Sequence, residues 1–269
     1  MHAPATPANQ PDLTVDLLLL AYRSGIFPMS DSRSDLEVFW VEPRNRAIIP
    51  LDGFHLSRSL ARVVKQDRFR VTCNAAFADV IRACAAPRAD HPDTWINPLI
   101  EASYIALHRA GHAHSIECWL GDELVGGLYG VSFERVFCGE SMFSRADNAS
   151  KVALAWLVAL MRHAGYRLLD CQFITDHLAS LGAVTVPRKR YLQLLADARA
   201  DGFQASLPDA WSAFAGAQFS AAGSSAGAAG AASAAGAAAA GAALPEPVDR
   251  ATGASSPGKL IAQSLTHTS

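Results

Sequence analysis

The chain has 269 residues and a formal net charge of −2, so it is long enough to bury one large core or two modest ones. The small net charge argues against a protein that coats nucleic acid by bulk attraction, although a local basic face is compatible with it. The five cysteines form no Cys-x-x-Cys pair, which argues against a disulfide framework or a zinc ribbon and favours a cytoplasmic location.

Neither a signal peptide nor a membrane-spanning segment is expected. The first twenty residues lack a basic region, and Asp16 interrupts their short apolar run. No later stretch is long and apolar enough to span a bilayer. We therefore expect no membrane partner.

The N-terminal part of the chain predicts short elements interrupted by proline. A helix is expected from about residue 12 to Gly25. A strand-like segment follows at 38–51, with Pro43 and Pro50 marking its breaks. We assign these elements to a small N-terminal domain, residues 1–60.

Residues 55–66 predict a helix with one basic face. His55, Arg58, Arg62 and Lys65 follow one another at spacings of three, four and three, so they share one side of the helix. Apolar residues occupy the opposite side. The pattern is typical of an ordinary solvated face, and it is also compatible with a stripe that binds phosphates.

Helices and strands are mixed over the rest of the folded part. Asn74 and Asn148 are placed to cap the helices that follow them, and Gly165 to end the second of these. Strands are expected at 68–73, 115–120, 124–133, 136–143 and 166–173, and helices at 74–85, 97–111, 148–165, 176–182 and 187–199. The pattern predicts an α/β (α+β) fold with a largely antiparallel mixed sheet, in a larger domain of residues 61–214.

The last part of the chain has low complexity. Residues 221–243 consist of 15 Ala, 5 Gly and 3 Ser. Such a stretch has no large apolar side chain to bury, so nothing offsets the entropy of ordering it. We therefore expect a disordered, flexible tail over residues 215–269, with a fraying alanine helix as the alternative.

Two apolar strands carry polar side chains where a core would normally place Val or Leu. Strand alternation puts Cys138, Glu140 and Met142 on one face of the first strand, and Asp170 and Gln172 on one face of the second. A buried carboxylate without a partner is costly, so these residues need an explanation. Either they form a structural hydrogen-bond network, or Glu140 and Asp170 face a common cleft and handle protons or a cation.

Three other groups of residues are weaker candidates. His112, His114 and Glu117 form a His-x-His-x-x-Glu cluster with no second ligand group nearby, so no metal site is predicted. Cys138 has no His close to it in sequence, which favours a buried thiol over a nucleophile. The glycines of residues 126–130 lack the spacing of a phosphate-binding loop and indicate a bulge or a close backbone approach.

Longer stretches of the chain resemble one family. "GDELVGGLYGVSFERVFCGESMFSRADNASKVAL" and "LLDCQFITDHLASLGAVTVPRKRYL" closely resemble the bacterial leucyl/phenylalanyl-tRNA–protein transferases. "AYRSGIFPMS", "PRNRAIIPLDGFHLSRSL" and "TWIN" are also similar to that family, in the same order and with similar spacing. The resemblance covers approximately residues 12–200 and leaves the alanine-rich tail outside it.

The resemblance implies an aminoacyltransferase of the N-degron pathway. Such an enzyme moves Leu or Phe, with Met as a further candidate, from aminoacyl-tRNA to the N-terminal amine of proteins that begin with Arg or Lys. The resemblance also implies a catalytic domain similar to the GNAT acetyltransferase fold. No cofactor and no metal are expected, because the aminoacyl ester is already activated and the enzyme must mainly position an amine against its carbonyl.

The resemblance also implies roles for single residues. In the family the Asp of "DCQ", here Asp170, takes a proton from the attacking amine, and the Gln two residues later, here Gln172, links the two. The Glu of "GESMFS", here Glu140, lies near the α-amino group of the aminoacyl moiety. Trp40 and Trp95 match positions near the terminal adenosine of tRNA, where a base can stack, although a tryptophan is more often part of a core.

Two further sets of residues follow from the family pattern. The family pocket for the Leu or Phe side chain is apolar, and the matching residues here are Leu128, Phe137, Met142 and Leu157. Given the resemblance, we interpret the basic stripe of Arg58, Arg62 and Lys65 as a contact for phosphates of the tRNA acceptor stem, which any suitably charged tRNA would satisfy.

Two other functions are compatible with parts of the pattern. An acyl-CoA-dependent N-acetyltransferase would cradle pyrophosphate with a Gly- and Arg-rich loop, but residues 144–150, "SRADNAS", contain no glycine. A non-catalytic RNA- or degron-binding module would explain the basic stripe and the tryptophans, but it would leave Asp170 and Gln172 without a purpose.

Overall fold

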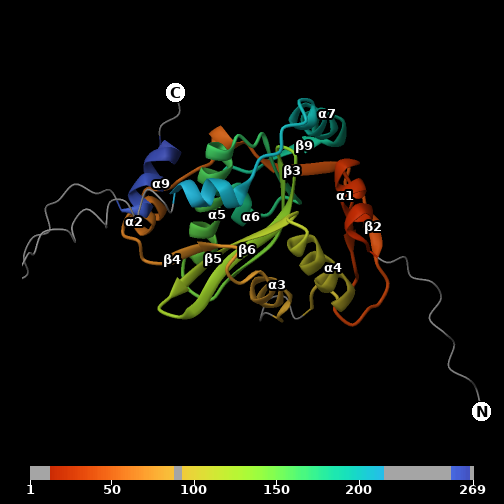
Figure 1. Cartoon of the computed structure of the whole chain (residues 1–269), viewed down its shortest axis with the longest axis horizontal. Coiled ribbons are helices and arrows are strands. Elements are labelled where there is room, and N and C mark those ends of the chain that lie inside the picture. The colour runs from red at the N-terminus through yellow and green to blue at the C-terminus, as the bar shows by residue number, and fades with distance from the viewer. Residues whose placement is uncertain (1–12, 88–92, 215–255, 267–269) are drawn as a thin grey trace, which may run out of the picture.

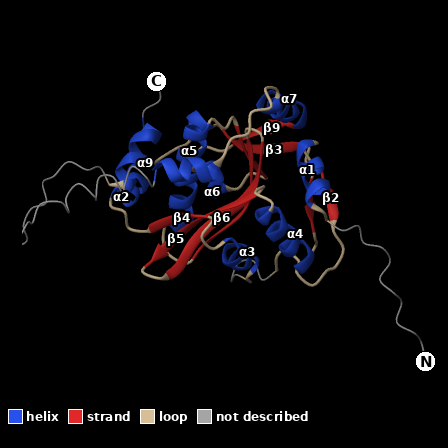
Figure 2. Ribbon diagram, viewed as in Figure 1, coloured by secondary structure: helices blue, strands red, loops and turns tan. Residues whose placement is uncertain are grey.

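A seven-stranded sheet forms the centre of the molecule, with helices on both of its faces (Figures 1 and 2). The computed structural model describes residues 13–87, 93–214 and 256–266. Its helices are α1 (Val15–Arg23), α2 (Arg58–Lys65), α3 (Phe77–Ala85), α4 (Pro98–Arg109), α5 (Ala149–Ala164), α6 (Asp176–Ala179), α7 (Arg188–Arg199) and α9 (Pro257–Thr266), with a 3-10 turn η1 (Leu51–Gly53) and a further helical segment at 207–214. Its strands are β1 (Phe27–Met29), β2 (Phe39–Val41), β3 (Asn45–Ile49), β4 (Arg70–Cys73), β5 (Ala113–Leu120), β6 (Glu123–Phe133), β7 (Val136–Ser144), β8 (Leu168–Gln172) and β9 (Val184–Pro187).

The large sheet is largely antiparallel, as the sequence predicts. Its strand order is β4-β5-β6-β7-β8-β3-β9, and β7 and β8 form its parallel pair. β5, β6 and β7 are the expected meander. The proline-broken segment at 38–51 divides between two sheets, because β2 pairs with β1 in a separate two-stranded sheet while β3 joins the large one.

Two buried clusters lie on opposite faces of the sheet. One packs against α2, α5 and α9 and includes Leu60, Leu157 and Ile261. The other packs against α1, α3, α4 and α7 and includes Leu18 and Ile81. Neighbouring residues of one strand belong to different clusters, as strand alternation requires. No helix in the described part of the chain is long and apolar enough to cross a membrane.

Two of the predicted helix caps are wrong. Asn148 precedes α5 in the left-handed conformation, with φ of 69°, and its side chain makes no capping bond. The hydroxyl of Ser144 accepts from the backbone amide of Ser150 instead, at 3.3 Å. Asn74 lies two residues before Ala76, the N-cap of α3, which has no side-chain capping bond. The backbone amides of Ala75 and Ala76, just before the helix, donate to the carboxylate oxygens of Glu117 at 3.4 Å. Neither helix therefore has the asparagine cap that the sequence predicts.

The expectation of a flexible tail is wrong for one segment. Residues 215–255 lie outside the described residues, but Pro257–Thr266 forms α9, which packs on α2 and α5. Ile261 and Ala262 are fully buried, and the backbone amide of Gly258 donates to Asp67 at 2.7 Å. The composition argument missed α9 because its few apolar residues are buried against distant helices rather than against one another.

Candidate active site

The site lies where two neighbouring strands of the sheet separate. β7 and β8 pair in parallel at three positions, from Val136 opposite Leu168 to Cys138 opposite Asp170. β7 then continues as far as Ser144, beyond the last paired position. Side chains that follow the last pair on each strand therefore line a space between the two strands.

Glu140 is placed by a β-bulge. On the neighbouring strand β6, Tyr129 pairs with Ser141 and Gly130 pairs with Gly139, so Glu140 is the extra residue of β7. The bulge reverses the alternation after it. Cys138 and Met142, which strict alternation puts on one face, therefore belong to different core clusters, and that prediction is wrong.

Glycine makes this bulge possible, as the pattern at 126–130 indicates. A Cβ on Gly130 would lie 2.3 Å from the carbonyl oxygen of Cys138. A Cβ on Gly126 would lie 2.4 Å from the Cβ of Ala149, at the start of α5. Both positions therefore require the close backbone approach that the sequence predicts.

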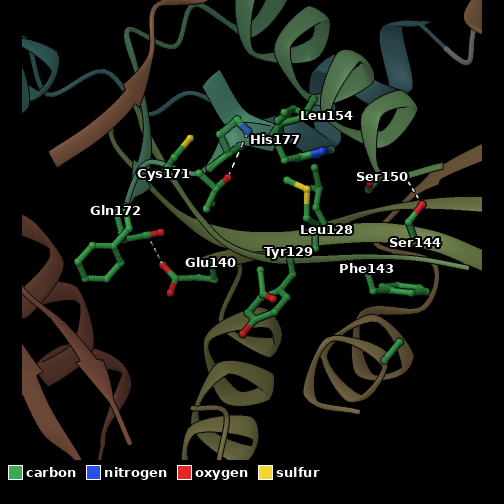
Figure 3. Close-up of a pocket in the computed structure, with 18 of the residues that line it drawn as sticks. Leu128, Tyr129, Glu140, Phe143, Ser144, Ser150, Leu154, Cys171, Gln172 and His177 are labelled. Atoms are coloured by element: carbon green, nitrogen blue, oxygen red, sulfur yellow. Dashed lines mark hydrogen bonds between the residues drawn. The ribbon is translucent and has the colours of Figure 1, made fainter. Parts of the chain in front are cut away.

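A pocket of about 770 Å³ opens between the separated strands (Figure 3). Apolar side chains from β6, β7, α5 and α6 line one part of it: Leu128, Met142, Leu154, Leu157 and Leu178. Glu140 and Gln172 face each other at another part, from β7 and from the end of β8 (Figure 3). The pocket thus joins an apolar wall to a carboxylate and an amide.

The carboxylate of Glu140 is bound by uncharged donors. Nε2 of Gln172 donates to Oε1 at 3.1 Å, and the hydroxyl of Tyr104 donates to Oε2 at 3.2 Å. The Tyr104 hydroxyl is in turn hydrogen-bonded to that of Tyr22. Burial is the largest influence on this carboxyl, and it raises the pKa of Glu140 to about 8. Glu140 therefore titrates near neutral pH.

Asp170 occupies a different environment directly beside it. Its carboxylate is fully buried and forms a two-point ion pair with Arg46, at 2.8 Å from Nε to Oδ1 and 2.5 Å from Nη2 to Oδ2. The hydroxyl of Tyr191 and the backbone amide of Gln172 also donate to it, at 3.1 and 2.9 Å. Asp170 is not among the residues that line the pocket.

Arg46 is itself held by packing. Its guanidinium carbon lies 4.6 Å from the ring centre of Phe27 and 4.6 Å from that of Tyr191. Its remaining nitrogen donates to the carbonyl of Gly25 at 3.3 Å. The guanidinium is thus bound to aromatic rings and a carbonyl from two separate segments of the chain, residues 25–27 and α7.

Comparison with known proteins identifies the family of this chain. The profile of the family described as "Leucyl/phenylalanyl-tRNA protein transferase" matches residues 48–196, and the profile of its N-terminal domain matches residues 11–44. The chain belongs to this family. A leucyl/phenylalanyl-tRNA–protein transferase of Novosphingobium aromaticivorans is 61% identical over 94% of this chain and 96% of its own.

A second relative matches over a shorter span. A relative with the same name from Rhizorhabdus wittichii is 64% identical over 67% of this chain and 73% of its own. Among solved structures, that of L-PGS from Bacillus licheniformis aligns with a TM-score of 0.35 and 13% identity, over 61% of this chain and 55% of that chain, a likeness too low to bear on the fold.

The structure of this transferase brings five of the predicted site residues to the pocket: Glu140, Gln172, Leu128, Met142 and Leu157. Phe137 is fully buried and is not among the residues that line it. Its ring would lie 2.5 Å from a Cβ on Gly130, so it packs beneath the bulge. Phe137 belongs to the same core cluster as Leu128 and Leu157 of the pocket wall.

The two tryptophans lie outside the residues that line the pocket. Trp40 is at the middle of β2, opposite Pro28, and is 36% exposed. Trp95 lies shortly before α4 and packs, partly buried, against the core cluster beneath α1, α3, α4 and α7. Both tryptophans thus belong to the half of the molecule that holds α1 and α4.

The basic stripe lies on an exposed side of α2. Arg58, Arg62 and Lys65 are exposed, while Leu60 and Val64 of the same helix are buried. Within the described ranges none of the three cations forms an ion pair. Their charges are therefore available to a partner.

Sequence reasoning missed several residues of the site. Arg46, Tyr104 and Tyr191 contact the two carboxylates from β3, α4 and α7. His177 of α6 also lines the pocket, and its Nε2 is buried without a hydrogen-bond partner among the described residues. Arg46 could have been predicted from the sequence, because it is a charged residue directly before an apolar run. A buried Asp170 needs a cation as its partner.

The cysteine at the site is not a nucleophile. Cys138 is fully buried, and burial followed by the nearby charge of Asp170 raises the pKa of its thiol well above the ordinary value. Because the thiolate is the reactive form, a thiol with a raised pKa is inert. This agrees with the buried role that the sequence predicts for Cys138.

Proposed function

We propose that this protein transfers Leu or Phe from aminoacyl-tRNA to the N-terminal amine of proteins that begin with Arg or Lys. The observation that carries the proposal is the pocket between β7 and β8, which joins an apolar wall to Glu140 and Gln172. Membership of the leucyl/phenylalanyl-tRNA protein transferase family supports the reaction class.

The apolar wall suits the side chain of the transferred amino acid. Leu128, Met142 and Leu157 offer no polar partner, so a polar amino acid would lose its hydrogen bonds to water on entering. A volume of about 770 Å³ falls in the usual range for small-molecule sites, roughly 300 to 1,000 Å³, and accommodates a Leu or Phe ester with part of its nucleoside.

The polar part of the pocket suits the amines. Glu140 accepts a hydrogen bond from an ammonium or amine group, and Gln172 holds Glu140 in place by its own amide. The α-amino group of the aminoacyl moiety and the amine of the acceptor both need such a partner. The positive side chain of an N-terminal Arg or Lys is favoured near this carboxylate as well.

The tRNA is expected to bind by stacking and by charge. Trp40 and Trp95 provide aromatic faces for the unpaired bases of the 3′ end. Arg58, Arg62 and Lys65 provide exposed cations for phosphates of the acceptor stem. Contacts of these kinds do not read sequence, which fits an enzyme that accepts more than one charged tRNA.

The decisive experiment measures the transfer of labelled Phe from Phe-tRNA to peptides. We expect purified protein to label a peptide that begins with Arg, and not its N-acetylated form or a matched peptide that begins with Met. Equal labelling of the Arg and Met peptides would contradict the proposed acceptor class. No labelling of any peptide, with tRNA binding intact, would indicate a binding module, and acetyl transfer from acetyl-CoA would indicate an N-acetyltransferase.

A further inference from the structure

We infer that Glu140 takes the proton from the attacking amine, and that Asp170 is a positioning residue whose buried carboxylate is bound by Arg46. The inference rests on the proposed transferase function. It departs from the role that the family resemblance implies for Asp170, and the reason lies in how the oxygens of the two carboxylates are occupied.

Asp170 has no free position for a proton. A carboxylate offers about four acceptor sites, and Asp170 receives four donated hydrogen bonds, two of them from Arg46 and one each from Tyr191 and the Gln172 amide. Its side chain is fully buried and does not line the pocket. A proton could reach it only by displacing one of these donors, and a guanidinium does not give up its charge.

Glu140 differs in each of these respects. It lines the pocket, and the hydrogen bonds from Gln172 and Tyr104 leave acceptor sites open toward that space. Within the described residues no Lys or Arg hydrogen-bonds it. The carboxylate is therefore accessible to an amine and is not hydrogen-bonded to a cation within the described residues.

The groups around Glu140 set its proton affinity. The groups that face it are Tyr104 of α4, Tyr22 of α1, Tyr129 of β6, Cys138 of β7, Gln172 and Asp170 of β8, and Arg46 of β3. Burial and the charge of Asp170 disfavour the ionised form, while the tyrosine hydroxyls and Arg46 favour it. The resulting pKa of about 8 is close to that of a free α-amine, about 7.7 to 8.0, so proton transfer between the two costs little.

Glu140 alone can accept and return the one proton that the reaction moves. The amine nitrogen attacks the ester carbonyl, the carbon–nitrogen bond forms, and the nitrogen gives one proton to the Glu140 carboxylate. The bond from the carbonyl carbon to the ribose oxygen then breaks. Glu140 returns the proton to that oxygen, which leaves as a hydroxyl, so no proton is gained or lost overall.

Arg46 and Asp170 act on this reaction through Gln172. The backbone amide of Gln172 donates to Oδ1 of Asp170, and the residue has φ of 54°, in the left-handed region that non-glycine residues seldom adopt. This backbone conformation directs its side-chain amide to Glu140. The chain of contacts from Arg46 through Asp170 and Gln172 therefore fixes where the Glu140 carboxylate lies.

The test is single-turnover transfer of Phe from Phe-tRNA to an Arg-initiated peptide, across a range from about pH 6 to 9.5. Glu140→Gln keeps the shape of the side chain, and we expect it to lower the high-pH plateau rate about 100-fold or more, with Phe-tRNA binding changed less than about threefold. Glu123→Gln, at an exposed position on β6, is the matched control and is expected to behave as wild type.

Tyr191→Phe tests Asp170 without removing the ion pair. The substitution removes one hydrogen-bond donor from Asp170 and leaves its pairing with Arg46 in place. A rate controlled by proton transfer to Asp170 would therefore have a different midpoint in its pH profile. We expect the midpoint of the pH–rate profile of Tyr191→Phe to equal that of the wild type. A shifted midpoint, or a folded Asp170→Asn variant that loses the plateau while Glu140→Gln keeps it, would overturn the inference.

Chemical rescue separates proton transfer from structure. We expect formate to restore part of the activity of Glu140→Ala, because a small carboxylate replaces the missing base. Failure of formate to restore any activity, with weakened Phe-tRNA binding, would assign Glu140 to substrate binding and overturn the inference alone. A wild-type enzyme that transfers to no free-amine peptide would overturn the proposed function as well.

Discussion

The guanidinium of Arg46 donates hydrogen bonds to both carboxylate oxygens of Asp170, at 2.8 and 2.5 Å, and neither side chain is more than 1% exposed. The pair joins β3 to β8, two neighbouring strands of the large sheet. It thus links the first fifty residues of the chain to the strand that carries the site.

Breaking this pair should be costly. Arg46→Met leaves a buried carboxylate without its cation, and we expect the free energy of unfolding to fall by about 3 to 5 kcal/mol. Urea unfolding measures the change. Arg82→Met is the matched control, since the exposed Arg82 pairs with Asp79 at 3.3 Å and with Glu101 at 3.5 Å, and its loss should cost about 1 kcal/mol or less. Equal losses in the two variants would mean that the buried pair is no stronger than a surface one.

The bulge at Glu140 should depend on Gly130. In Gly130→Ala the new Cβ would lie 2.3 Å from the Cys138 carbonyl oxygen and 2.5 Å from the Phe137 ring, so β6 and β7 must move apart. We expect a loss of about 1 to 3 kcal/mol in unfolding free energy. Gly139→Ala is the comparison, because the nearest atom to its Cβ is 3.6 Å away. A Gly130→Ala variant as stable as Gly139→Ala would contradict the close approach.

The apolar wall should set the preference between Leu and Phe. Leu157 is buried on α5 and lines the pocket, so Leu157→Phe reduces the space for the larger side chain. We expect kcat/KM for Phe-tRNA to fall about tenfold relative to that for Leu-tRNA, which corresponds to roughly 1.4 kcal/mol. Leu160→Phe enlarges another buried residue of α5 that does not line the pocket, and it should leave the ratio unchanged.

The basic stripe should give tRNA binding part of its salt dependence. We expect Arg62→Ala to weaken Phe-tRNA binding and to lower the slope of log affinity against log salt by about 1. Arg190→Ala removes the same charge from an exposed position on α7 and serves as the control. Identical slopes for the two variants would exclude a phosphate contact at Arg62.

Glu140 should make stability fall as the pH rises. Its pKa is raised from 4.5 to about 8 in the folded protein, so between these values the folded state binds a proton that the unfolded state has lost. Folding is therefore penalised progressively above about pH 4.5, and the penalty is complete above about pH 8. Glu140→Gln should raise the free energy of unfolding relative to wild type more at about pH 8.5 than at about pH 5, by on the order of 2 kcal/mol after allowance for solvent screening. A difference that does not change with pH would show that the pKa of Glu140 is not raised.

Much of this architecture follows from local sequence. Alternating apolar residues and a tight turn are enough to predict the meander of β5, β6 and β7, and glycine spacing at 126–130 predicts the close approach at Gly130. The unusual polar residues Glu140 and Asp170 stand out because burial without a partner is costly. These signals are local, since each depends on residues that are near one another in the chain.

The different environments of the Glu140 and Asp170 carboxylates depend on tertiary structure. Asp170 is bound by Arg46, 124 residues away, while Glu140 is bound by Tyr104 from α4. The bulge that reverses alternation in β7 depends on its pairing with β6. The sequence determined which residue types are available for the chemistry. Only the folded chain decided which carboxylate is saturated by donors and which one faces the pocket, because hydrogen-bond partners are brought together by packing and not by spacing.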